Sequence, residues 1–190
     1  MRFTDAENAG VATPSIPFGV LAIVNGALWL ALGLVAFGAP TFWSPSSPLD
    51  YAAVGLFSAA VLTLGLCLLR FADGRSRAPS IAARVGGISA FVVSAANFAE
   101  DWLRISPFGI LWVAGVFVAT GAMLVLGVAL AGVPGRRALA APVLLTIAGV
   151  FLGSTPYARL LIAIVWIVTG ALNLARVRPF RGEDADAGLR

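Results

Sequence analysis

Long apolar stretches, separated by short polar ones, set the pattern of this chain. Six stretches each come near the roughly 20 apolar residues that a helix needs to cross a bilayer core about 30 Å thick. They cover residues 18–39, 51–70, 81–98, 108–133, 138–155 and 157–177. None shows the alternation of apolar and polar residues that a barrel strand requires. The pattern therefore predicts an all-α polytopic membrane protein, a bundle of six transmembrane helices.

Two of the six stretches are weaker than the others. The stretch 81–98 is less hydrophobic, and 138–155 is short and carries Pro142 in its predicted first turn, where a helix tolerates proline. The alternative is a bundle of four spans, in which one of these stretches is an interfacial or re-entrant segment.

The distribution of arginine, which supplies all 13 basic residues, predicts the orientation. With the N-terminus in the cytoplasm, eleven arginines lie in the cytoplasmic parts and only Arg104 and Arg159 lie outside. Positive residues favour the cytoplasmic side, so both termini are expected there, in a bacterial-type inner (plasma) membrane. An odd number of spans would break this partition. The six-span domain, 18–177, is then flanked by polar cytoplasmic tails, 1–17 and 178–190.

The predicted loops alternate in composition. The outer loops contain Ser-Pro or Thr-Pro steps, as at 106–107 and 155–156, whereas the inner loops use Gly and Arg. Proline suits the first turn of a helix and disfavours helix in the residue before it. Similar residues recur in the second helix of each predicted hairpin, at 58–65, 120–127 and 169–172. These features predict three tandem helical hairpins.

Composition supports a membrane location and excludes several classes of protein. Apolar residues make up 59% of the chain and charged residues 12%, against about 25% charged in a typical soluble domain, so a soluble fold would lack polar cover. The arginines lie at segment ends and form no basic stripe, so no nucleic-acid partner is expected. The absence of His and the single cysteine, Cys67, argue against a zinc or copper site. Cys67 lies inside an apolar run, and we favour a buried thiol over an intermolecular link.

Motifs of catalysis are missing from the sequence. It contains no glycine-rich phosphate loop, no Ser-centred elbow and no His-based or metal constellation. Only asparagines and scattered Ser and Thr are available at membrane depth. We therefore expect neither enzyme activity nor a cofactor.

Three asparagines are the polar residues expected to reach membrane depth: Asn25, Asn97 and Asn173. A buried amide needs hydrogen-bond partners, so these side chains are expected to point into the bundle. They could line a substrate path, but we favour hydrogen bonds between helices.

Two adjacent carboxylates, Glu100 and Asp101, follow the third stretch on its outer side. Ionisable groups at a membrane are functional candidates, and such a pair could sense or relay protons. Arg104 stands four residues after Glu100, however, which is the spacing of an ordinary surface ion pair. We favour a solvated helix end and keep proton sensing as the functional alternative.

Small residues at four-residue spacing, such as Gly149 and Gly153, allow helix backbones to approach closely in lipid. They could form contacts in a homo-oligomer, but we favour packing within one bundle because every stretch has such a face.

The last third of the chain contains Phe151-Leu152-Gly153-Ser154-Thr155-Pro156, followed by an apolar helix with Thr169-Gly170. This segment resembles the final hairpin of the acid-resistance membrane proteins of the HdeD type. The resemblance implies six spans with internal hairpin repeats, both ends in the cytoplasm and a role in envelope or acid stress. It carries over no catalytic residue. The first outer loop is longer than the family pattern.

The sequence thus predicts a non-enzymatic, stress-associated membrane protein that stabilises the membrane or a partner. The bilayer is its expected partner, with a homo-oligomer or another membrane protein as further candidates. The alternatives are a small oligomeric transporter or channel, with the three asparagines near its path, and an accessory subunit of a larger membrane complex.

Overall fold

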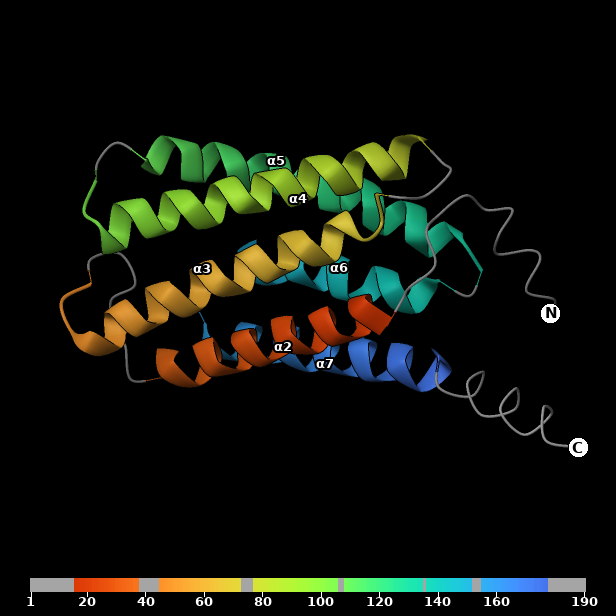
Figure 1. The fold of residues 1–190 in the computed structure, drawn as a ribbon, viewed down its shortest axis with the longest axis horizontal. Coiled ribbons are helices and arrows are strands. Elements are labelled where there is room, and N and C mark those ends of the chain that lie inside the picture. The colour runs from red at the N-terminus through yellow and green to blue at the C-terminus, as the bar shows by residue number, and fades with distance from the viewer. Residues whose placement is uncertain are drawn as a thin grey trace, which may run out of the picture.

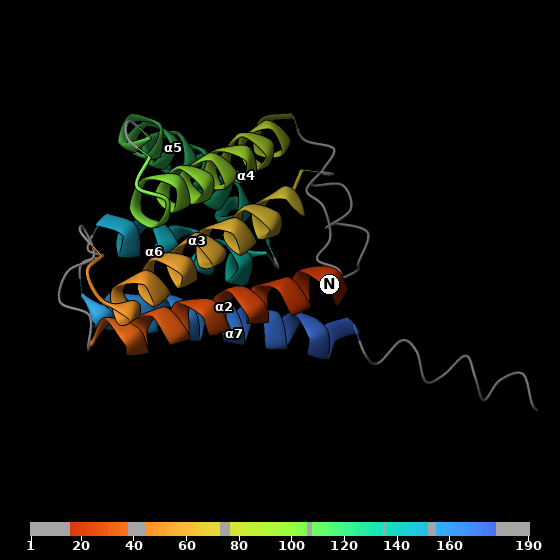
Figure 2. The same ribbon diagram turned by 60° about the vertical axis from the view of Figure 1, so that its left-hand side comes forward.

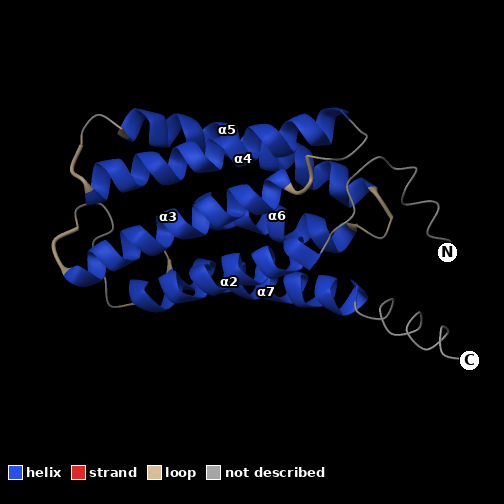
Figure 3. Cartoon of the chain, viewed as in Figure 1, coloured by secondary structure: helices blue, strands red, loops and turns tan. Residues whose placement is uncertain are grey.

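The computed structural model of the chain describes residues 16–37, 45–72, 77–105, 108–134, 136–151 and 155–177. These residues are almost entirely helical, as predicted, and contain no strand (Figure 3). The helices are α2 (Ile16–Ala36), α3 (Pro48–Leu69), α4 (Arg77–Asn97), the π-helix η1 (Phe98–Trp102), α5 (Gly109–Gly132), α6 (Arg137–Phe151) and α7 (Pro156–Val177). The predicted tails, residues 1–15 and 178–190, lie outside the described residues.

Five of these helical segments are long and apolar enough to cross a membrane: α2, α3, α4 together with η1, α5 and α7. The chain therefore has the helices of an integral membrane protein. The exception is α6, whose 15 residues extend about 22 Å at 1.5 Å per residue. The third predicted span is thus long enough, whereas the fifth is short and its role as a full span stays a prediction.

The helices form a closed ring in which each packs against its neighbours in sequence and α7 packs against α2. Three levels are visible in Figures 1 and 2, with α4 beside α5, α3 level with α6, and α2 beside α7. The direction alternates around the ring, so that α2 begins and α7 ends at the same end of the bundle (Figure 1). Because α3 packs on α4 as extensively as on α2, no separate hairpin unit stands out, and the tandem repeat stays a prediction.

The interior of the ring is filled by apolar side chains from all six α-helices. Trp166 of α7 and Leu32 of α2 have no exposed surface, and Phe18 of α2 meets Phe71 edge to face at 5.2 Å. Such a core gains dispersion contacts that lipid alone would not provide.

Glycines on α2 bring it close to α7. Gly19, Gly26 and Gly33 recur every seven residues, and a Cβ added to any of them would lie within 3 Å of an α7 side chain. At Gly26 that Cβ would also lie 2.7 Å from the carbonyl oxygen of Ala163. This seven-residue spacing, which the sequence shows but which was not among the predicted packing residues, allows the backbones to pack closely.

Large apolar side chains face outward on every α-helix. Examples, one from each of α2 to α7, are Leu34, Leu62, Ile88, Phe117, Val150 and Ile164. Soluble proteins rarely expose such a continuous apolar surface. A hydrocarbon solvent around the bundle explains it.

The structure corrects the expected position of Pro142. Because α6 begins at Arg137, Pro142 lies inside this helix and not in its first turn. The Thr146 hydroxyl donates a hydrogen bond to the Pro142 carbonyl at 2.7 Å. Trp166 Nε1 in turn donates to the Thr146 hydroxyl at 2.9 Å, which links α6 to α7 through buried polar atoms.

Candidate functional site

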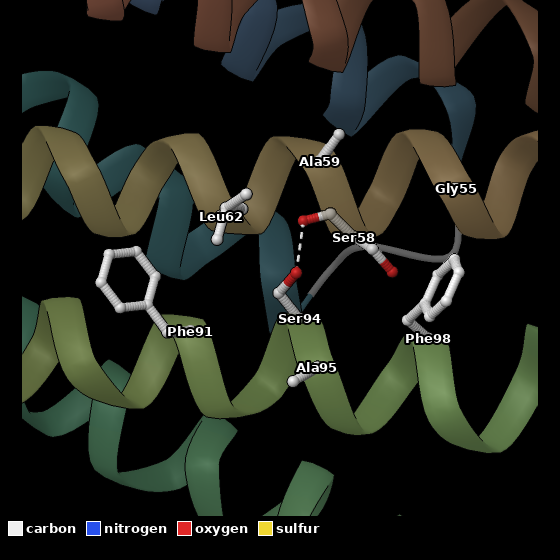
Figure 4. Close-up of a pocket in the computed structure, with 8 residues that line it drawn as sticks. All are labelled: Gly55, Ser58, Ala59, Leu62, Phe91, Ser94, Ala95 and Phe98. Carbon is white, nitrogen blue, oxygen red and sulfur yellow. Dashed lines mark hydrogen bonds between the residues drawn. The ribbon is translucent and has the colours of Figure 1, made fainter. Parts of the chain in front are cut away.

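A groove with a volume of about 350 Å³ runs between α3 and α4. Small residues create it: Gly55 and Ala59 on α3, and Ala95 on α4. In Figure 4, Phe91 and Phe98 stand at its two ends along α4. The eight lining residues are Gly55, Ser58, Ala59, Leu62, Phe91, Ser94, Ala95 and Phe98.

Polar atoms in the floor of the groove are bonded across the helix interface. Ser94 Oγ donates to the carbonyl oxygen of Ser58 at 2.7 Å (Figure 4). Asn97 Nδ2 donates to Ser58 Oγ at 3.0 Å. All three residues are buried. Since these groups have partners, the groove presents apolar walls that make little demand for further hydrogen bonds.

Aromatic residues lie at the end of the groove where η1 continues α4. Phe98 and Trp102 stack with ring centroids 5.4 Å apart. Trp102 also meets Tyr51 of α3 edge to face at 5.6 Å. A Cβ added to Gly55 would lie only 3.3 Å from Trp102 Cζ3, so the glycine makes room for the indole. π-Helical turns are rare and often occur at functional sites.

Arg104 lies directly beyond this cluster. It is exposed and has a backbone φ of 59°, in the left-handed region that residues other than glycine seldom adopt. Its Nη2 donates to Tyr51 Oη at 3.0 Å and to the carbonyl oxygen of Pro45. The guanidinium lies 5.8 Å from the Tyr51 ring centroid, a cation–π contact. These contacts hold one cation at the end of the groove nearest η1.

A capping box fixes the chain that carries Pro45. Asp50 N donates to Ser47 Oγ at 3.2 Å, and Asp50 Oδ2 accepts from Ser47 N at 2.9 Å. Oδ2 also accepts from Ser46 N at 3.1 Å. The Ser-x-x-Asp spacing before an apolar run is the sequence signal of this box, and it was not among the predictions made from sequence.

Glu100 and Asp101, the predicted proton-sensing pair, both lie in η1 and are half-buried. The Glu100 carboxylate faces the start of α5, since a Cβ on Gly109 would lie 2.7 Å from Glu100 Oε1. A negative charge is favourable at a helix N-terminus. Arg104 makes its hydrogen bonds to Tyr51 and Pro45 and not to Glu100, so the expected helical ion pair is replaced by these contacts.

The three predicted asparagines lie at three different places in the bundle. Asn97 lies on α4 and bonds to Ser58 of the groove, and Asn25 Oδ1 accepts a hydrogen bond from Thr63 Oγ1 of α3 at 3.0 Å. Asn173 is buried on α7 near Gly19 of α2. The structure therefore does not bring the three together along one path.

The described residues include two buried donors without an acceptor on α2, one helical turn apart. They are Asn25 Nδ2 and Trp29 Nε1. Asn25 has no exposed surface and Trp29 is 3% exposed, so water outside the bundle does not reach them. A buried donor without an acceptor lowers the stability of the fold, and these two are the described donors on α2 that lack one.

Of the predicted packing pair, Gly149 lies on α6 against Ile162 of α7, inside the bundle. Gly153 lies outside the described residues. Cys67 is buried in the core, in the position expected of a free thiol.

Comparison of the chain with protein-family models, with curated proteins and with solved structures finds no match. What the groove can do follows from its own residues. They supply apolar walls, serine groups that bond across the helix interface, an aromatic cluster at the end nearest η1 and an exposed cation beyond it.

Proposed function

We propose that this chain is a non-enzymatic membrane protein of six spans that supports the cell envelope through its contacts with lipid or with a membrane partner. This proposal rests on how apolar and polar side chains are distributed around the helices. Large apolar side chains point outward on all six α-helices, whereas polar ones bond between helices inside the bundle. A bilayer favours this arrangement because it offers no hydrogen bonds to exposed polar groups.

Both termini are proposed to face the cytoplasm. The end of the bundle where α2 begins carries most of the described arginines: Arg70, Arg77, Arg84, Arg136 and Arg137. The opposite end carries only Arg104 and Arg159 among the described residues. This asymmetry supports the orientation that the positive-inside rule favours.

Acid stress is the proposed context, and it rests on the resemblance to the HdeD type together with the outer carboxylates. The negative charge of Glu100 complements the N-terminus of α5. A Glu100→Gln change would remove this charge and weaken the connection between α4 and α5. Asp101 lies beside Glu100 in η1.

Survival of a deletion strain after acid challenge tests this proposal. Wild type and an Asp73→Asn control, which neutralises a carboxylate on the predicted cytoplasmic side, should restore survival. A Glu100→Gln, Asp101→Asn double variant should not. If deletion leaves survival unchanged, the stress role is wrong. If the double variant restores survival fully, the stress role stands without the carboxylates.

A small transporter or channel is the second candidate, and the unpaired donors of Asn25 and Trp29 favour it. The filled core around Trp166 opposes it, because no described opening connects the two ends. Ion flux into proteoliposomes that falls on Asn25→Ala would establish this function. Reproducible co-purification of one membrane protein in mild detergent would instead support an accessory subunit.

A further inference from the structure

We propose that the groove between α3 and α4 holds one acyl chain of an ethanolamine-type phospholipid, whose phosphate lies beside Arg104. The inference rests on the proposed function, because it requires that the bundle be embedded in a bilayer. It adds to that function a lipid of defined chemistry and the residues that would recognise it.

The shape of the groove fits a single chain. On α3 its lining extends from Gly55 to Leu62, a distance of about 10 Å along the helix axis. On α4 it extends from Phe91 to Phe98, so the groove follows the helices and hence the direction of acyl chains in the membrane.

The chemistry of the walls fits hydrocarbon. Ser94 Oγ and Asn97 Nδ2 donate hydrogen bonds to Ser58 across the helix interface. An occupant therefore needs no donors or acceptors, and a polar substrate would lose its own hydration without replacement. An acyl chain that moves from the surrounding lipid into the groove makes no hydrogen bonds in either place, so it loses none.

The outer end of the groove fits a phosphate. Tyr51 and Trp102 form the kind of aromatic pair that lies at the level of lipid headgroups. Arg104 is exposed beyond them, and both of its hydrogen bonds are made by Nη2. Its other two nitrogens carry N–H groups in the planar geometry that suits phosphate. The hydrogen bonds to Tyr51 and Pro45 hold the cation at this position.

The surrounding charges favour an ammonium headgroup over a purely anionic one. Asp101 is half-buried in η1, three residues before Arg104. An anionic lipid would meet this carboxylate beside the cation. A zwitterionic lipid instead offers its phosphate to Arg104 and its ammonium group to a carboxylate.

The test compares lipid retained by four versions of the full chain, each purified in mild detergent and also reconstituted in phosphatidylcholine vesicles containing spin-labelled phosphatidylethanolamine. The versions are wild type, Ala59→Leu, Arg104→Gln and Gly121→Leu. Ala59→Leu fills the groove, and Arg104→Gln removes the cation. Gly121→Leu is the matched control, because Gly121 is exposed on α5 with nothing near its Cβ position.

Wild type and Gly121→Leu should retain phosphatidylethanolamine in a fixed ratio to protein. Ala59→Leu should lose it, and Arg104→Gln should bind it about tenfold more weakly, as expected when a hydrogen bond to a charged group is lost. Arg104→Gln should also lose the preference for phosphatidylethanolamine over phosphatidylglycerol. Because the two variants act at opposite parts of the site, misfolding of one leaves the other informative.

Equal retention by wild type and Ala59→Leu would overturn the inference. So would a second copy or another protein that occupies the groove, detected as an oligomer or complex lost on Ala59→Leu while lipid retention is unchanged. Recovery in alkaline-washed membranes separates this inference from the proposed function. A chain that stays in washed membranes but retains no lipid refutes the inference alone, whereas a chain released by the wash refutes both.

Discussion

Gly65 of α3 and Gly87 of α4 face each other so closely that a Cβ added to either would lie within 3.0 Å of the other's carbonyl oxygen. Each glycine thus admits the backbone of the opposite helix. Side chains cannot relieve such a contact, because the opposing atom belongs to the main chain. This pair sets the separation of α3 and α4 just past the end of the groove that lies away from η1.

Alanine at Gly65 or Gly87 should therefore destabilise the bundle by about 1–3 kcal/mol, the usual cost of overpacking. Gly121→Ala, with open space at its Cβ position, should change stability little. Unfolding by sodium dodecyl sulfate, followed by intrinsic fluorescence, measures the difference. Equal effects at Gly65 and Gly121 would show that α3 and α4 can separate freely.

Replacing Thr146 with valine should leave the Trp166 indole N–H without its acceptor inside the core. The change keeps the shape of the side chain, so the loss is that of an unsatisfied buried donor, about 1–3 kcal/mol. Thr120→Val on α5 is the control, because Thr120 lies outside this pair. We expect a lower unfolding midpoint and altered Trp fluorescence for Thr146→Val only.

The capping box at the start of α3 leads to a prediction for that segment alone. Ser47→Ala removes the acceptor for Asp50 N and should cost about 0.5–2 kcal/mol. Because the box positions Pro45, whose carbonyl binds Arg104, the loss should also loosen that arginine. Hydrogen exchange over residues 45–51 should accelerate, with little change at α6. Exchange that rises uniformly along the chain would contradict a local role.

Accessibility of introduced cysteines tests the proposed orientation. Cys67 is fully buried and should not react with a membrane-impermeant maleimide in intact cells. In a Cys67→Ala background, Ser44→Cys should be labelled from outside, and Ser76→Cys only after the cells are permeabilised. The reverse pattern would place both termini outside the cell.

The helices could be predicted from sequence because a bilayer selects them by length and hydropathy alone. The apolar runs located every α-helix, with ends displaced by a few residues where local chemistry intervened. At α3 the cap of Ser47 starts the helix before the apolar run, and at α4 the helix includes Arg77. Such displacements follow from hydrogen bonds that hydropathy does not measure.

The groove could not be predicted in the same way. It depends on Gly55 and Ala59 of one helix facing Ala95 of another, and this in turn depends on how α3 and α4 are rotated about their axes. A run that is apolar on all sides carries no information about rotation. The hydrogen-bond partners of Asn25 and Asn97 could not be predicted from the sequence for the same reason. The seven-residue spacing of Gly19, Gly26 and Gly33, in contrast, can be recognised in the sequence.

The contact between α2 and α7 has a consequence for biosynthesis. Of the described helices, α2 leaves the ribosome before the others and packs most extensively on α7, so its glycine face stays uncovered until α7 has been made. A chain interrupted before residue 156 would present that face to other membrane proteins or to quality-control proteases. Docking of α7 thus covers the glycine face and closes the ring of described helices.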